Sequence, residues 1–338
     1  MKKACIVLLA FLLTLSIFGC SEKKEETPAE PEVTTIEITD QIGRKVTLDK
    51  PAEKVVSTYY LVTASLLTLG LKDRIVGVEM KANSRGLYKL AAKEMLDLPG
   101  VGSGKEINVE AIAALEPDVV FLPKKQKDAA DTFTELGIAS IVVDPESYDK
   151  FNELITIIGD VCGVKDKADQ LIGYYEDVVK EVSSLTDGAD SPSVYIAGES
   201  SYLRTCAGGM YQREMVEISG GSCVSSALEG SSWTDVSAEQ LLSWNPDYIF
   251  VVSYAEYGID DIKNDEALKD LTAVKEGRIY QIPSKIEAWD YPQPSSVLGL
   301  YWMAGILHPE LVEATRYQTE AKEFYKTYYN IEITNEDL

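Results

Sequence analysis

The residues best suited to chemistry in this chain are aromatic and cationic side chains placed just after expected β-strands. They are Tyr59, Tyr60, Arg85, Tyr202, Arg204, Trp233, Tyr254 and Trp289, with Tyr291 in the same cluster. The rings could stack on a flat or aromatic ligand, and the arginines could pair with carboxylates or other anionic oxygens. Each side chain alone could equally pack its own domain or face solvent, so the prediction of a binding site depends on the whole cluster.

These residues are expected in loops because strand and helix patterns alternate along most of the chain. A β-hairpin is predicted over 35–49, with Gly43 in its turn. Strands are predicted at 54–57, 75–78, 119–122, 141–143, 194–197, 248–253 and 278–282, and helices at 63–69, 128–136, 148–162, 165–184, 211–219 and 265–271, with a last helix pair from 295. Such alternation favours parallel, right-handed, doubly wound sheets, whose ligands bind outside the carboxyl ends of the strands.

One unit of the sequence occurs twice. The stretch from Asn108 to Phe121 returns from Ser237 to Phe250, and in both copies a glutamate stands seven residues before a Pro-Asp pair. Each copy begins with polar residues, continues with apolar residues at helical spacing, and contains a proline that ends the helix before a run of residues that favour a β-strand. The duplication predicts two similar lobes with a cleft between them.

A length of 338 residues also favours two domains. We expect an α/β fold of two doubly wound, Rossmann-like lobes, at 35–163 and 188–338, joined by a single long helix within 164–187. The ligand cleft would lie between the lobes. Because one stiff helix would restrict bending, we expect ligand capture to involve small motions of the lobes.

The N-terminus predicts export and a lipid anchor. Lys2 and Lys3 precede an apolar stretch over 4–18 that is too short to span a bilayer comfortably, and Gly19-Cys20 follows. This pattern resembles a bacterial lipoprotein signal over 1–19, with acylation of Cys20; the alternative is an ordinary secretory peptide in which Cys20 is incidental. The segment 20–34 is expected to be a flexible tether. The chain would thus be extracytoplasmic, anchored to the bacterial cell membrane at its periplasmic or outer surface.

The net charge and the cysteine content restrict which partners, disulfides and metal sites the chain can have. A net charge of −23 disfavours nucleic acid, because a phosphate backbone would be repelled. Apart from Cys5 and Cys20, the cysteines are Cys162, Cys206 and Cys223. Cys206 and Cys223 could pair in an oxidising compartment, although separate buried thiols are the expectation. The sequence has no Cys-x-x-Cys motif, so we predict no metal site held by the protein.

Several motifs together resemble one family. Asp40-x-x-Gly-Arg44, Val55–Ser57, the stretch from Gly102 to Ile112, and Trp244-Asn-Pro-Asp247 are similar to the iron-chelate, haem and vitamin B12 class (class III) of solute-binding proteins. The resemblance covers roughly residues 36–315. It implies a monomer that delivers its ligand to an ABC permease dimer with its ATPase.

In that family an acidic residue on each lobe docks into arginine pockets of the permease. The matching positions here are Glu110 and Glu239, one in each copy of the repeat. Equivalent carboxylates on similar lobes suit a permease dimer that presents equivalent cationic sites. The alternative is that each glutamate only stabilises the start of its own helix.

The resemblance implies a transported iron complex (siderophore or haem) or a corrinoid, and no covalent group other than lipid on Cys20. His308, the only histidine, precedes a proline near an expected helix end, so axial haem ligation by histidine is not expected, whereas tyrosine could bind ferric iron. The segment from Trp289 to Trp302 also resembles members that take molybdate or tungstate, which makes an oxyanion the alternative ligand. A hydrolytic enzyme is a distant third hypothesis, since the sequence has no nucleophile-elbow, zinc-protease or phosphate-loop motif.

Overall fold

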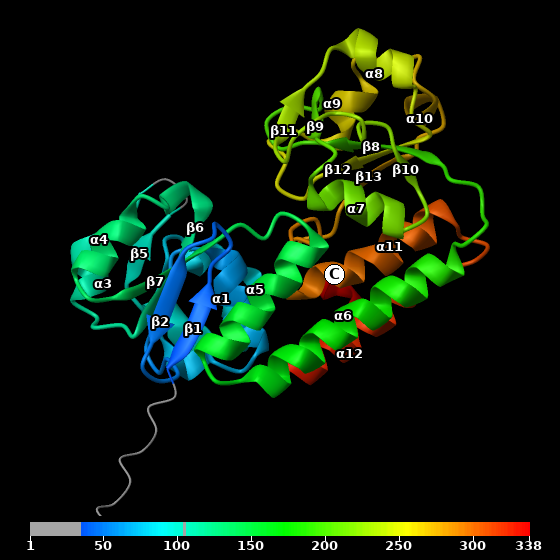
Figure 1. Ribbon diagram of the computed structural model, residues 1–338. Coiled ribbons are helices and arrows are strands. Elements are labelled where there is room, and N and C mark those ends of the chain that lie inside the picture. Colours follow the sequence, from blue (N-terminus) through cyan, green and yellow to red (C-terminus); the bar gives the residue numbers. More distant parts are fainter. Residues whose placement is uncertain (1–34, 104–105) are drawn as a thin grey trace, which may run out of the picture. The chain divides into compact units, whose positions relative to one another are not determined.

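A computed structural model describes residues 35–103 and 106–338 (Figure 1). The proposed signal, tether and acylated Cys20 lie outside these residues. The described chain begins with the predicted hairpin, in which β1 (Ile36–Thr39) pairs antiparallel with β2 (Lys45–Leu48). Gly43 has a φ of 87°, a left-handed conformation that glycine adopts without steric cost. The Asp40 carboxylate accepts the Arg44 backbone N–H at 2.8 Å, and this bond closes the turn.

The first parallel sheet has the strand order β5-β4-β3-β6-β7. Its strands are β3 (Val55–Ser57), β4 (Ile75–Glu79), β5 (Gly100–Gly102), β6 (Val119–Pro123) and β7 (Ala139–Val143). The helices around it are α1 (Tyr60–Thr68), α2 (Gly86–Ala91), α3 (Val109–Ala113), α4 (Ala129–Glu135) and α5 (Tyr148–Val161). The central strands β3 and β6 are buried along their whole length, as expected for a sheet covered on both faces.

The second parallel sheet has the order β10-β8-β12-β13. Its strands are β8 (Ser193–Ala197), β10 (Ser222–Cys223), β12 (Tyr248–Val251) and β13 (Ile279–Gln281), and a separate antiparallel ribbon pairs β9 (Arg204–Cys206) with β11 (Trp233–Asp235). The helices of this half are α7 (Tyr211–Ile218), α8 (Ala238–Trp244), α9 (Ile259–Lys263), α10 (Thr272–Lys275), α11 (Leu298–Leu307) and α12 (Arg316–Tyr329). The predicted fold of two parallel α/β sheets is confirmed.

The chain before α6 (Lys165–Leu185), with the first sheet, and the chain after it, with the second sheet, are called the two halves. In both halves the repeated sequence caps its helix in the same way. The Asn108 side chain accepts the Ala111 backbone N–H at 2.9 Å at the start of α3. The Ser237 hydroxyl likewise accepts the Gln240 backbone N–H at 3.1 Å at the start of α8. Each bond satisfies one of the amide groups that a helix leaves unpaired in its first turn.

The aspartate of each Pro-Asp pair also accepts equivalent hydrogen bonds in both halves. Asp118 Oδ2 accepts the backbone N–H groups of Glu53 and Lys54, both at 2.8 Å, just before β3. Asp247 Oδ2 accepts the backbone N–H of Ser193 at 2.9 Å and its hydroxyl at 2.7 Å, at the start of β8. In each half the aspartate therefore attaches the strand that follows it to the neighbouring strand of the sheet.

The segment between the two sheets is the helix α6 (Lys165–Leu185). Figure 1 shows α12 running beside α6, and the rings of Tyr174 and Phe324 lie 5.8 Å apart between these helices. At its far end α12 reaches α1, where the hydroxyls of Thr68 and Tyr329 are 2.7 Å apart. The C-terminal helix thus also contacts the half that contains the first sheet, although the chain itself crosses only once. The lobe boundaries at 163 and 188 stay a prediction.

One predicted helix, at 265–271, is wrong. The chain forms turns there, between α9 and α10. The Asp265 carboxylate accepts the Ala267 backbone N–H at 2.8 Å and the Tyr202 hydroxyl at 2.8 Å. A side chain that bonds the backbone two residues ahead stabilises a turn in competition with a helix. Among residues 35–103 and 106–338, no helix has the length and apolar character needed to cross a membrane.

Candidate ligand-binding site

A cavity of about 250 Å³ is lined by residues from both halves of the chain. Tyr60 comes from the start of α1 and Arg85 from the residue before α2. Tyr254 follows β12, and Tyr291 belongs to the loop that follows β13. The other lining residues are Ala64, Ser84, Gly86, Leu87, Tyr88, Ser253, Ser284, Lys285, Ile286, Glu287, Ala288 and Gln293. The cavity therefore lies at the carboxyl ends of strands, where open α/β sheets bind ligands.

Three tyrosines form one wall of this cavity. The rings of Tyr254 and Tyr291 are stacked with their centroids 4.5 Å apart. Tyr60 meets Tyr291 edge-on at 5.3 Å, which joins the first half of the chain to the second. Tyr59 does not line the cavity, but its ring packs edge-on against Tyr60 at 5.6 Å. The wall offers aromatic faces to a ligand and holds the two halves in contact.

Arg85 and Tyr60 present unused hydrogen-bond donors at the cavity. The guanidinium carbon of Arg85 lies 4.0 Å from the centroid of the Tyr60 ring, a cation–π contact. Neither the buried Nε of Arg85 nor the buried Tyr60 hydroxyl has a hydrogen-bond partner among the described residues. Burial raises the pKa of Tyr60 well above its ordinary value, so the hydroxyl keeps its proton near neutral pH. Buried donors without acceptors are costly, and an acceptor-rich ligand would satisfy them.

The carboxyl groups near the cavity are buried, and burial raises their pKa values. Glu79 accepts the hydroxyls of Thr63 and Tyr88, each at 2.8 Å, and lies 3.9 Å from Arg85 Nε. Desolvation raises the pKa of Glu287 to about 7 and that of Asp290 to about 6. Groups with such pKa values are partly or wholly protonated in mildly acidic solution. They therefore repel an anion less than the same carboxylates would at the surface.

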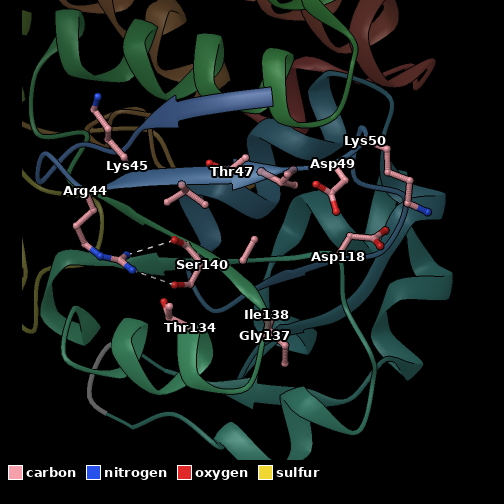
Figure 2. Close-up of a pocket in the computed structure, with 13 residues that line it drawn as sticks. Arg44, Lys45, Thr47, Asp49, Lys50, Asp118, Thr134, Gly137, Ile138 and Ser140 are labelled. Carbon is pink, nitrogen blue, oxygen red and sulfur yellow. Dashed lines mark hydrogen bonds between the residues drawn. The ribbon is translucent and has the colours of Figure 1, made fainter. Parts of the chain in front are cut away.

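A larger groove, of about 410 Å³, lies between the hairpin and the start of β7 (Figure 2). Figure 2 shows Arg44 donating to Ser140, and the distances are 3.3 Å to the backbone oxygen and 3.5 Å to the hydroxyl. The same guanidinium pairs with Asp40 at 3.3 Å, so its charge is already compensated. This groove lies at the amino ends of β6 and β7, opposite the edge where ligands of such sheets bind.

The family of the chain follows from comparison with known sequences. A sequence profile described as "Periplasmic binding protein" matches residues 55–286, a segment that contains every strand of both parallel sheets. The chain belongs to this family. It is a solute-binding protein of an ABC importer, and the family and its similar structures are substrate-binding transport proteins.

Three relatives show how far this binding protein has diverged. The molybdate-binding protein MolA of Haemophilus influenzae is 24% identical, over 86% of this chain and 90% of MolA. A solved structure of MolA bound to molybdate is similar with a TM-score of 0.77, and the match covers 88% of this chain and 99% of that one. An uncharacterized ABC transporter substrate-binding lipoprotein of Bacillus subtilis, YvrC, is 24% identical, over 92% and 99% of the two chains. The petrobactin-binding protein YclQ of the same organism is 22% identical, over 84% and 92%.

Three of the expected ligand residues of this binding protein lie on or beside the ribbon β9–β11, outside the cavity lining. Arg204 Nη2 donates to the Trp233 backbone oxygen at 3.4 Å, and Arg204 Nε lies 3.8 Å from Asp235. The Trp233 ring lies against Gly198, where an added Cβ would sit only 2.8 Å from the ring. Tyr202 meets Tyr257 edge-on at 5.4 Å. The ribbon adjoins the carboxyl end of β8, but the structure does not bring these three residues into contact with Arg85.

Trp289 is placed differently from the expectation. The side chain is 1% exposed and packs edge-on against Tyr317 at 5.8 Å, among the core residues of this binding protein. Its loop does reach the cavity, through Glu287 and Tyr291. No role was predicted for Glu287 or for Tyr88. For Glu287 the available signal was its position after an expected strand, whereas Tyr88 lies inside a helix.

Glu110 and Glu239 are both exposed and lie in the first turns of α3 and α8. The caps of these helices are Asn108 and Ser237, so the glutamates are not needed as caps. Hydrogen bonds from its own backbone N–H and from Ser237 lower the pKa of Glu239, which keeps the carboxylate charged. Two charged groups at equivalent positions are thus available to a partner of the binding protein.

His308 lies away from the cavity. It is buried, and its Nε2 is 3.2 Å from the Gly220 backbone oxygen. No group of three or more histidine, cysteine, aspartate or glutamate side chains within the described ranges could hold a metal ion.

Proposed function

We propose that this binding protein captures a small, oxygen-rich anion and delivers it to an ABC permease. The observation that carries the proposal is the pair of buried donors, Arg85 Nε and the Tyr60 hydroxyl, at a cavity reached from both halves of the chain. A carboxylate, catecholate or metal-bound oxygen would accept both bonds. The aromatic wall of Tyr254 and Tyr291 would contact the rest of the ligand.

An iron complex of a small carboxylate or catecholate chelator fits this description best. Ligand pockets of drug-sized molecules have volumes of about 300–1,000 Å³. A cavity of about 250 Å³ therefore favours a small chelate over a corrinoid or haem. The family resemblance and the petrobactin-binding relative support iron as the metal in the complex. The metal would arrive as part of the ligand.

An oxyanion such as molybdate is the second candidate. A relative and a similar structure are both named for molybdate, and an oxyanion needs the same donors that Arg85 and Tyr60 offer. The stacked tyrosines distinguish the two candidates, because a bare oxyanion has no flat face to contact them. No catalytic residues are proposed, and the chain is not expected to be an enzyme.

The lining of the cavity supports a proposal for which of the predicted side chains touch the ligand. Tyr60, Arg85 and Tyr254 would contact it directly, and Tyr59 would support Tyr60. The ribbon residues would touch only a ligand that extends toward β8; they are Tyr202, Arg204 and Trp233. Trp289 would support the loop that carries Tyr291.

We also propose that the protein is a lipid-anchored monomer on the outer side of the bacterial cell membrane, acylated on Cys20 after removal of residues 1–19. The lipoprotein relative YvrC and the apolar stretch that ends in Gly-Cys support this. The lobes would be 35–163 and 188–338, and Glu110 and Glu239 would dock onto the permease dimer. Loss of fatty-acid labelling in a Cys20→Ala chain, with labelling retained in Cys162→Ala, would test the anchor.

Isothermal titration tests the ligand. The panel contains ferric complexes of citrate and of a catecholate, molybdate, tungstate, haem and cobalamin. We expect binding in the micromolar range or tighter for at least one ferric chelate or oxyanion, and none for cobalamin. Binding of cobalamin or haem alone, or of no anion in the panel, would contradict the proposal.

A further inference from the structure

Two cysteines of the second half lie in contact. The sulfur atoms of Cys206 and Cys223 are 3.9 Å apart, and both side chains are buried. The Ser225 hydroxyl lies 3.7 Å from the first sulfur and 3.3 Å from the second. The remaining cysteine within residues 35–103 and 106–338 is Cys162, which lies at the end of α5, before α6 in the chain.

The two cysteines belong to different parts of the second half. Cys206 ends β9 and pairs with Trp233 of β11 in the ribbon. Cys223 ends β10, an edge strand of the second sheet, where it pairs with Val194 of β8. A bond between the sulfurs would therefore tie the ribbon to the edge of the sheet.

We propose that Cys206 and Cys223 form a disulfide in the exported protein. A disulfide requires a sulfur–sulfur distance of about 2.05 Å, so the two sulfurs, which are in contact at 3.9 Å, would have to move about 2 Å closer. A periplasmic binding protein works outside the cytoplasm, where such bonds form and persist. This inference does not depend on the identity of the ligand.

The chemistry is thiol–disulfide exchange with an external disulfide, either a protein disulfide or a small-molecule one. The Cys223 thiolate attacks one sulfur of the oxidant, forms a mixed disulfide and releases the first thiol. The Cys206 thiolate then attacks the Cys223 sulfur, forms the internal disulfide and releases the second thiol. In total two protein thiols become one disulfide while one external disulfide becomes two thiols. Because both side chains are buried in the folded protein, this exchange takes place during folding.

The disulfide would fix the position of two side chains, Arg204 and Trp233, that the sequence predicts as ligand-binding. Arg204 and Trp233 stand at the two ends of the paired ribbon strands, and both adjoin the carboxyl end of β8. A closed loop from Cys206 to Cys223 limits the unfolded chain, so oxidation should also stabilise the fold. We expect reduction to lower the melting temperature by roughly 5 °C.

Peptide mapping tests the proposal on the full chain. The chain is unfolded with reductant and refolded in a mixture of oxidised and reduced glutathione. It is then unfolded in urea with iodoacetamide present, so that buried thiols are also alkylated, and digested with trypsin. Arg213 lies between the two cysteines, so they fall on separate peptides, 205–213 and 214–263. We expect these two peptides to be found joined, with a mass two hydrogens below their sum. Cys162, on peptide 151–165, should be alkylated and serves as the internal control.

Alkylation of Cys162, Cys206 and Cys223 together in most of the refolded protein would overturn the proposal, as would a link that involves Cys162. A Cys206→Ser/Cys223→Ser chain provides the second measurement. Reductant should lower the melting temperature of the wild type and leave that of this variant unchanged. Equal melting temperatures with and without reductant in a linked wild type would overturn the role of the bond in fastening the ribbon.

Discussion

The guanidinium carbon of Arg85 lies 4.0 Å from the centre of the Tyr60 ring, and each side chain contributes a buried donor that finds no acceptor within residues 35–103 and 106–338. Tyr60 in turn touches Tyr291 from the other half of the chain. The contact therefore links the cation of the site, its unused hydroxyl and the aromatic wall. A ligand that satisfies the two donors would also join the two halves.

Removing the Arg85 charge should weaken ligand binding strongly. Hydrogen bonds to charged groups contribute about 1.5–3 kcal/mol, so Arg85→Gln should raise the Kd roughly 10- to 100-fold. Titration calorimetry with the tightest ligand of the panel measures this. Arg278 is a matched control, because its guanidinium lies 5.2 Å from the Tyr248 ring, outside the cavity lining. An Arg85→Gln affinity as high as that of Arg278→Gln would remove Arg85 from the site.

The Tyr60 hydroxyl should matter for binding and not for stability. Tyr60→Phe removes a buried hydroxyl that makes no hydrogen bond within the described residues, so the free energy of unfolding should stay the same or rise slightly. Ligand affinity should fall by about 1 kcal/mol, or roughly fivefold. Tyr195→Phe is the opposite case, since its hydroxyl donates to the Tyr202 backbone oxygen at 2.9 Å. That variant should lose stability and keep its affinity, and the reverse pattern in urea denaturation and titration would refute this assignment.

Stability should depend on pH through Glu287. Burial raises its pKa to about 7, above the ordinary value of 4.5, so the folded protein binds the proton more tightly than the unfolded chain does. The stability this group contributes is complete below pH 4.5 and is lost as the pH rises through 7. Glu287→Gln stays neutral, so its stability relative to the wild type should grow by up to about 3 kcal/mol between pH 4.5 and pH 7. Urea denaturation at several pH values measures the difference, and parallel curves for the two proteins would show that Glu287 is not responsible.

The two Pro-Asp aspartates should stabilise the fold to similar extents. Asp118 and Asp247 each accept two hydrogen bonds at the start of a neighbouring strand. Replacing either by alanine leaves strand-edge donors unpaired and should cost roughly 1–3 kcal/mol in urea denaturation. Asp131, which is exposed on α4, gives the control substitution and should change stability by less than about 0.5 kcal/mol. A large loss in only one of the two repeats would show that their roles are not equivalent.

Reversing the charges of Glu110 and Glu239 should abolish delivery of the ligand to the permease and leave ligand binding unchanged. Both carboxylates are exposed and distant in sequence from the cavity residues, so the double Lys variant should bind ligand with an unchanged Kd. Uptake by cells should fall to background, because like charges would then face the cationic sites that the docking proposal places on the permease. Glu332→Lys, at another exposed carboxylate, should leave uptake intact. Normal uptake by the double variant would exclude the docking role.

Much of the fold could be predicted because local signals agree with the tertiary structure. The repeat predicted two helix–strand units, and both are capped and attached in the same way by Asn108 and Asp118 and by Ser237 and Asp247. The helix predicted at 265–271 failed because the Asp265 carboxylate bonds its own backbone and Tyr202 across the fold. Helical spacing in the sequence contains no information about such a distant partner.

The site was harder to predict than the fold, because a loop position does not say which way a side chain points. Tyr254 and Trp289 both follow strands of the second sheet, yet Tyr254 stacks on Tyr291 at the cavity and Trp289 is buried against Tyr317. The sequence offered contact between Cys206 and Cys223 only as the alternative to separate buried thiols, because β9 and β10 belong to different sheets and their spacing along the chain does not say whether the two sulfurs meet.

The central claim is that one small anion binds at the Arg85–Tyr60 cavity. A crystal structure of the protein with the tightest ligand of the titration panel, located by the anomalous scattering of its metal, tests this most directly. We predict ligand oxygens within hydrogen-bond distance of Arg85 and of the Tyr60 hydroxyl, with Tyr254 or Tyr291 in contact. Metal density in the groove beside Arg44 and Ser140, or no ligand between the two halves, would contradict the account.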